Sequence, residues 1–160
     1  MFNSKGFLSK KQPIEDDIFP MNILIEKRVS NDDLTDIISQ ILNLERKDIF
    51  VVEDIQDLQI KIPNNIKVIC ETINIEGDFR TSLSLYPKSK IAQYIIQQFC
   101  NENQLAKKIC DILKCNCLTK KESLSDEDCY WLIQHNSDEL RYLYLDSQKL
   151  DKGIYVIEKN

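Results

Sequence analysis

Glycine and proline are scarce in this sequence, and each glycine stands alone. The chain has 160 residues, of which three are Gly and four are Pro. Phosphate-binding loops need closely spaced glycines, as in G-x-x-x-x-G-K-[ST] or G-x-G-x-x-G, and Gly6, Gly77 and Gly153 form neither pattern. The same scarcity argues against collagen-like or long flexible stretches, so it favours regular helices and strands.

Histidine and long apolar runs are also lacking. A His-based nucleophilic triad would depend on His135 alone, which stands beside a predicted turn. No window approaches the roughly 18 apolar residues of a membrane helix, and the first residues contain no apolar run long enough for a signal peptide. We therefore expect a cytoplasmic protein without a membrane segment, and one that is not an enzyme.

Cysteine is comparatively frequent, and its interpretation depends on the compartment. Six cysteines would suggest a disulfide framework in a secreted chain, but in a reducing cytosol they are expected to be free core residues. The closest pair, Cys115-Asn116-Cys117, lacks a second pair and the histidines of a zinc site. The sequence therefore predicts neither a metal nor another cofactor.

The charge balance is mildly acidic. Asp and Glu number 26 against 21 Lys and Arg, which gives a formal net charge of −5. Because the basic residues are scattered rather than gathered in a stripe, direct nucleic-acid binding is disfavoured, whereas a basic protein partner is suited. Glu53, Asp54 and Asp57 follow an apolar strand on a predicted loop, so they are candidate partner-binding residues. The alternative for such acidic clusters is solvated surface and helix capping.

The pattern of apolar residues predicts a flexible arm at residues 1–19 and a single α+β domain at 20–160. Ser30 and Ser89 are expected to cap helices, the second of which covers residues 89–113 as one kinked helix or two. The element order predicts a mixed or mainly antiparallel sheet with two or three helices on one face. A ferredoxin-like β-α-β-β-α-β core with extra strands is one specific arrangement. Strands are predicted at residues 21–28, 49–52, 66–75, 79–86, 115–118, 130–135, 141–145 and 154–157.

Aromatic residues concentrate in the C-terminal strands. Tyr142 and Tyr144 are two positions apart, so they share one face of their strand, opposite Leu143 and Leu145. Trp and Tyr are enriched at interface hot spots, which makes Tyr142 and Tyr144 candidate partner-binding residues. Trp131 is expected in the core of the sheet.

The C-terminal stretch CYWLIQHNSDELRYLYLDSQKLDKGIYVI resembles the ending of many small bacterial toxin-immunity proteins of the contact-dependent growth inhibition type. The resemblance covers about the last quarter of the chain. It rests on an aromatic-apolar strand at 130–133, a strand ending in Leu145-Asp146, and a final Gly-containing hairpin at 153–157. It implies a cytoplasmic protein that binds a toxin domain, commonly a nuclease with a basic cleft, and blocks its active site.

Two other classes of function stay open at this point. One is an adaptor, chaperone or regulatory interaction domain, which co-purification with a larger complex would favour. The other is an enzyme or ligand-binding protein, which a deep pocket with convergent polar groups would favour. The residues alone do not determine the oligomeric state.

Overall fold

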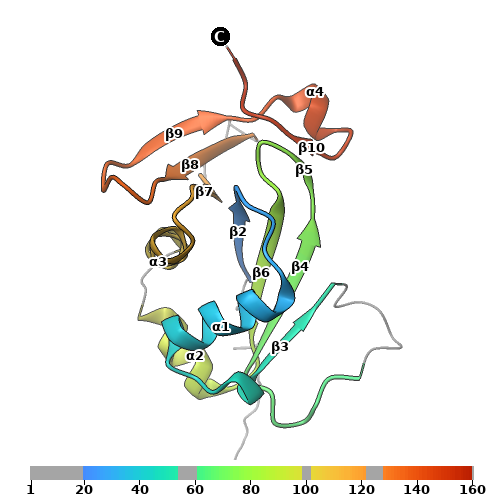
Figure 1. Cartoon of the computed structure of the whole chain (residues 1–160), viewed down its shortest axis with the longest axis vertical. Helices are drawn as coiled ribbons and strands as arrows, with labels where there is room; N and C mark the ends of the chain where they lie inside the picture. Colours follow the sequence, from blue (N-terminus) through green and yellow to red (C-terminus); the bar gives the residue numbers. More distant parts are fainter. Residues whose placement is uncertain (1–19, 54–60, 99–101, 122–127, 160) are drawn as a thin grey trace, which may run out of the picture.

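The computed structural model describes residues 20–53, 61–98, 102–121 and 128–159, and in these ranges it has a seven-stranded sheet, a two-stranded sheet and helices (Figure 1). The predicted arm at residues 1–19 lies outside the described residues. In chain order the elements are β2 (Met21–Ile25), α1 (Asn31–Leu42), the 3-10 helix η1 (Arg46–Asp48), β3 (Ile49–Val52), β4 (Val68–Asn74), β5 (Glu76–Gly77), β6 (Thr81–Pro87), α2 (Lys90–Gln97), α3 (Glu102–Leu113), β7 (Cys117–Lys120), β8 (Cys129–Ile133), β9 (Arg141–Tyr144), α4 (Ser147–Leu150) and β10 (Ile154–Tyr155).

The large sheet has the order β3-β4-β6-β2-β7-β8-β9. Strands β2 and β4 are both antiparallel to β6, which lies between them, and α1 is part of the connection from β2 to β4. Likewise β6 and β7 are both antiparallel to β2, and α2 and α3 connect them. These two split units form the predicted ferredoxin-like core, to which β3, β8 and β9 are added. Only the β3–β4 pair of this sheet is parallel, so the prediction of a mainly antiparallel α+β fold is confirmed.

Two serines begin helices as their sequence context predicts. The side chain of Ser30 accepts a hydrogen bond of 3.1 Å from the backbone N–H of Asp33, and that of Ser89 accepts one of 3.0 Å from Ala92. Each bond satisfies an N–H that has no partner within its helix. The region 89–113 contains two helices, α2 and α3, and residues 99–101 between them lie outside the described residues.

Several strand boundaries differ from the prediction by one to three residues, and at two of them the reason is tertiary. Strand β2 ends at Ile25 rather than at residue 28, because its neighbour β7 begins at Cys117, which is paired with Ile25. Strand β7 in turn begins two residues later than predicted. Helix α3 is followed by Lys114 with a φ of 55°, so Cys115 is still in the connection.

The sheet buries both of its faces. Alternation along β2 sends Ile23 and Ile25 into a core beneath α1, α2 and α3, which also holds Leu34 and Ile109. Leu24 points to the other face. There it joins a second cluster with Phe79, Leu118 and Leu145, against which Leu150, Tyr155 and Ile157 of the C-terminal segment pack.

The C-terminal segment covers that second face, and its strand pairs with a strand that is distant in the sequence. Strand β10 is parallel to β5, in the loop between β4 and β6, rather than forming a hairpin with the preceding residues (Figure 1). Helix α4 was not predicted, and the Asp146 side chain caps it by accepting 3.1 Å from the N–H of Lys149. In the described ranges, no helix is both long and apolar enough to span a bilayer.

Candidate functional site

Glu53 lies at the end of β3, on one edge of the large sheet, with an exposed side chain. It borders a hollow of about 880 Å³ at the end of the sheet. Asp54 and Asp57, predicted to act with Glu53, lie outside the described residues. The hollow is lined by Arg28, Val29, Ser30, Asn31, Glu53, Thr72, Ile73 and Asn74.

The first turn of α1 adds carboxylates to this end of the molecule. Ser30 and Asn31 line the hollow, and the exposed Asp32 and Asp33 follow directly in the chain. The guanidinium of Arg46 lies 3.3 Å from a carboxylate oxygen of Asp32 and also pairs with Asp36. We call Glu53, Asp32 and Asp33 the acidic end; Asp32 and Asp33 are not part of the sequence pattern after β3 that indicated Glu53.

Tyr142 and Tyr144 lie on β9, at the opposite edge of the large sheet from Glu53, with five strands between β3 and β9. Glu53 and the two tyrosines therefore lie on two separate surfaces rather than one. Leu143 and Leu145 pack into the second core, so the predicted division of the two faces of this segment is confirmed.

The side chains of Trp131, Tyr142 and Tyr144 form an aromatic surface with Lys121. The ring centroids of Trp131 and Tyr142 are 6.2 Å apart, as are those of Tyr142 and Tyr144, and both contacts are edge-to-face. Tyr142 is 58% exposed and Tyr144 37%. The ammonium of Lys121 lies 5.5 Å from the Trp131 centroid and 5.3 Å from that of Tyr142. Trp131, expected in the core, packs only partly buried against the helix-side core.

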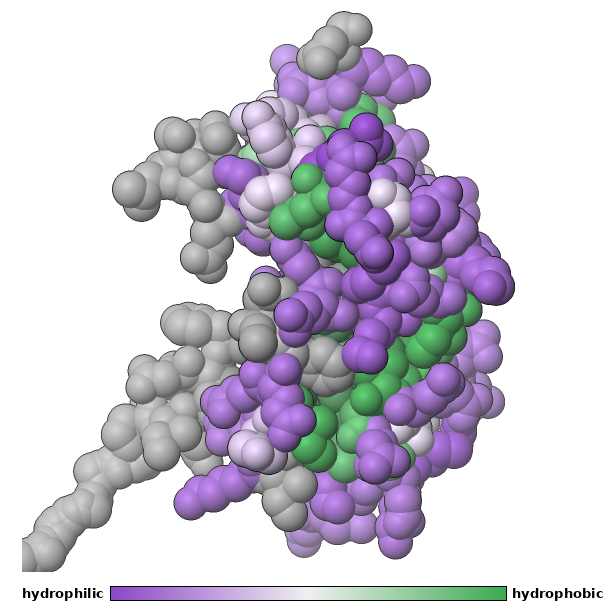
Figure 2. Space-filling model, turned by 90° about the vertical axis from the view of Figure 1, so that its left-hand side faces the viewer, coloured by the Kyte–Doolittle hydropathy of each residue, from purple (hydrophilic) through white to green (hydrophobic). Residues whose placement is uncertain are grey.

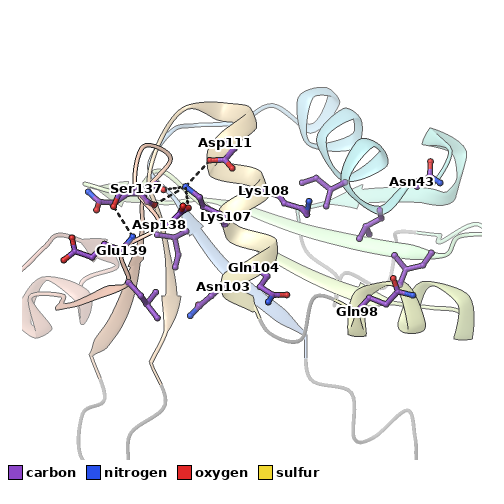
Figure 3. A pocket seen from close by; sticks show the side chains of 16 residues that line it. Asn43, Gln98, Asn103, Gln104, Lys107, Lys108, Asp111, Ser137, Asp138 and Glu139 are labelled. Carbon is purple, nitrogen blue, oxygen red and sulfur yellow. Dashed lines mark hydrogen bonds and ion pairs between the residues drawn. The ribbon is translucent and has the colours of Figure 1, made fainter.

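A third feature, which sequence reasoning missed, is a groove of about 970 Å³ where α3 lies beside the turn between β8 and β9 (Figure 3). Figure 2 shows this side of the molecule, where apolar surface (green) is exposed among hydrophilic surface (purple). The groove is lined by Ile41, Leu42, Asn43, Ile95, Gln98, Asn103, Gln104, Lys107, Lys108, Asp111, Ile133, Gln134, Ser137, Asp138, Glu139 and Leu140.

Lys107 binds the turn between β8 and β9, which forms one wall of this groove. Its ammonium donates to the backbone carbonyls of Gln134 at 2.7 Å, Ser137 at 3.1 Å and His135 at 3.3 Å, and it lies 3.2 Å from a carboxylate oxygen of Asp111. The pair with Asp111, four positions along the helix, is visible in the sequence. The hydrogen bonds to the three carbonyls cannot be predicted from the sequence, because no local pattern places this turn beside α3.

Replacing Lys107 with methionine should loosen the β8–β9 turn, because three carbonyls lose a charged donor at once. We expect the free energy of unfolding to fall by about 1–3 kcal/mol and amide exchange to accelerate at Ser137 and Glu139. Urea unfolding and hydrogen exchange measure the two effects. Lys152→Met, at an exposed position after α4, is the matched control and should change neither. Equal behaviour of the two variants would show that Lys107 does not hold the turn.

The cysteines of the described ranges are free and buried, and three of them interact. A hydrogen bond with the Cys117 thiol lowers the pKa of Cys115 to about 7. Burial raises the pKa of Cys117 well above its usual value, and hydrogen bonds with Cys110 and Cys115 raise it further. Within the described ranges, no three or more His, Cys, Asp or Glu side chains are grouped so that they could hold a metal ion.

Comparison with protein-family models, with curated proteins and with solved structures finds no match to this chain. The assignment of function therefore depends on the chain's own surfaces. Of the three surface features, the acidic end and the aromatic surface carry exposed side chains of the kinds that recognise proteins, and they occupy opposite edges of one sheet.

Proposed function

We propose that this chain is an immunity protein that binds a basic toxin domain, such as a nuclease, in the cytoplasm and blocks its active site. The observation that supports this most directly is the acidic end, where the exposed Glu53 borders a hollow beside the carboxylate-bearing first turn of α1. Carboxylates presented together can occupy a cleft that binds phosphates, because they offer the same kind of anionic oxygen to Arg and Lys side chains.

The acidic end is built on rigid elements, which lowers the entropic cost of binding. Strand β3 is paired in register with β4, where Val52 lies opposite Glu71, and the Val52 side chain is buried. This pairing fixes the backbone immediately before Glu53. Ile73, which is 48% exposed on the wall of the hollow, adds apolar contact area next to the charges.

A second candidate function is an adaptor or regulatory domain. The aromatic surface on β9 favours it, because a chain with two surfaces at opposite edges of its sheet can contact two proteins at once. Under this alternative the acidic end would bind a partner that has no toxic activity.

The test uses the tagged full chain to recover a toxin from the native bacterium, followed by an assay of that toxin's activity with and without the chain. Silencing of the toxin by the wild-type chain is the expected result. Recovery of a partner whose activity the chain leaves unchanged would contradict the immunity proposal and favour the adaptor alternative.

Reversing the charge at Glu53 tests the surface itself. Glu53→Lys should slow association with the recovered toxin roughly tenfold at low salt and make the rate less dependent on salt. Stopped-flow or surface-plasmon kinetics at several salt concentrations measure this. Glu158→Lys makes the same charge change next to the opposite edge of the sheet and is the matched control. If both variants associate as fast as the wild type, the acidic end does not contact the toxin.

A further inference from the structure

Three cysteines meet where α3 is connected to β7. Cys110 is on α3, Cys115 is in the connection and Cys117 begins β7, and all three side chains belong to the helix-side core. The backbone N–H of Cys115 donates to the carbonyl of Cys110 at 3.3 Å. The Cys110 thiol donates to the carbonyl of Ile133 at 3.4 Å, and Ile133 is the cross-strand partner of Cys117. Helix packing and strand pairing therefore gather the three thiols in one place.

Cys115 and Cys117 are the pair that a disulfide can join with the least rearrangement. Their thiols are already hydrogen-bonded to each other. Because the two residues are two positions apart, their Cα atoms are separated by at most about 7 Å, and a disulfide spans about 4.4–6.8 Å. A bond between them therefore requires only a slight closing of the connection, and α3 keeps its position on the sheet.

The surroundings favour a thiolate at Cys115 and a thiol at Cys117. The hydrogen bond from Cys117 lowers the pKa of Cys115 to about 7, and the backbone and charge of Lys27 lower it as well, against burial and the charge of Glu26. Burial raises the pKa of Cys117 well above its usual value, and burial also raises that of Cys70 to about 12. The thiolate is the nucleophilic form of cysteine, so Cys115 is the reactive member of the pair.

The connection that covers the pair is at the surface of the molecule. Cys115 is 2% exposed, whereas Lys114 before it is exposed and Asn116 after it is half-buried. Lys114 has a φ of 55°, a left-handed conformation that residues with a side chain rarely adopt. Two hydrogen bonds of 3.0 Å between Asn116 and Glu26 hold the connection on the end of β2. This cover excludes bulky reagents, but a molecule close to water in size needs only a small displacement of it.

We propose that Cys115 and Cys117 are a peroxide-reactive pair that forms a reversible disulfide. The Cys115 thiolate attacks one oxygen of hydrogen peroxide, so that an S–O bond forms, the O–O bond breaks and hydroxide leaves. The Cys117 sulfur then attacks the sulfur of the resulting sulfenic acid, and the S–O bond breaks as water leaves with the thiol proton. Two electrons pass from the two sulfurs to the peroxide. This site does not depend on the immunity proposal.

The first test treats the reduced full chain with one equivalent of hydrogen peroxide at neutral pH, blocks the remaining thiols and weighs the tryptic peptides. Trypsin cleaves after Lys108, Lys114 and Lys120, so Cys110 falls in the peptide 109–114, and the proposed pair falls together in the peptide 115–120. We expect the peptide 115–120 to lose two hydrogen atoms and to regain them with dithiothreitol. Cys70, the matched buried thiol, should be oxidised at least roughly tenfold more slowly. An unchanged peptide 115–120, or one linked to 109–114, would overturn the proposal.

The second test separates the roles of the two cysteines. Cys117→Ser keeps a hydroxyl that can donate to the Cys115 thiolate but cannot form the disulfide, so dimedone should trap a sulfenic acid on Cys115. Cys115→Ser should abolish both the trapping and the disulfide, and Cys70→Ser, the control, should change neither. Sulfenic acid on Cys117 of Cys115→Ser, formed at the wild-type rate, would refute the assignment. If a variant does not fold, the peptide masses of the wild-type chain still decide the proposal.

Discussion

Gly77→Ala should displace the C-terminal segment from the second face of the sheet. Gly77 has a φ of +117°, and a Cβ at this position would lie 2.3 Å from the carbonyl oxygen and 2.8 Å from the backbone nitrogen of Tyr155. Both contacts are backbone, so no side chain can move aside, and the parallel β5–β10 pair would have to separate. We expect the free energy of unfolding to fall by about 3 kcal/mol or more, since backbone strain adds to the lost packing of Tyr155 and Ile157.

Gly153→Ala is the matched control for that prediction. Gly153 also has a positive φ, +79°, but no atom lies within 4 Å of a Cβ built there. Its substitution should cost only the backbone conformational penalty, about 1–2 kcal/mol. Urea unfolding of both variants, with amide exchange at Tyr155, separates the two effects. Equal losses of stability would show that β10 does not lie against β5 in solution.

Ile109→Ala should be the other strongly destabilising change. Ile109 lies on α3, is fully buried, and belongs to the core beneath the three helices. Truncating a buried Ile to Ala removes apolar contacts and leaves a cavity, which costs about 2–5 kcal/mol. Because α3 also carries Lys107, we expect amide protection in the β8–β9 turn to fall together with global stability.

Ile112→Ala makes the same chemical change three residues further along α3. Ile112 is 36% exposed, so its loss should cost below about 1 kcal/mol. Chemical denaturation of the two variants measures the difference. If Ile112→Ala destabilises the chain as much as Ile109→Ala, the face that α3 turns toward the sheet is assigned incorrectly.

The candidate sites show which features of a binding surface can be predicted from neighbouring residues alone. Tyr142 and Tyr144 were recognised as sharing one face because strand alternation depends on residues two positions apart. Glu53 was recognised as exposed because it directly follows a short apolar strand. Local reasoning could not predict whether Glu53 and Tyr142 belong to one surface. That depends on the strand order, which places β3 and β9 at opposite edges of the sheet.

The sequence by itself determined most of the elements of the large sheet, the helices α1 to α3, and the α+β class. Caps at Ser30 and Ser89, the apolar run Ile49–Val52 and the helical spacing of α1 and α3 all depend on residues within a few positions, where steric and hydrogen-bonding preferences act directly. Tertiary structure alone decided the pairing of β5 with β10. It also decided the hydrogen bonds from the Lys107 ammonium to backbone carbonyls 27 to 30 positions along the chain. These features arise because burying both faces of one sheet brings distant segments together, and no local preference encodes which segments meet.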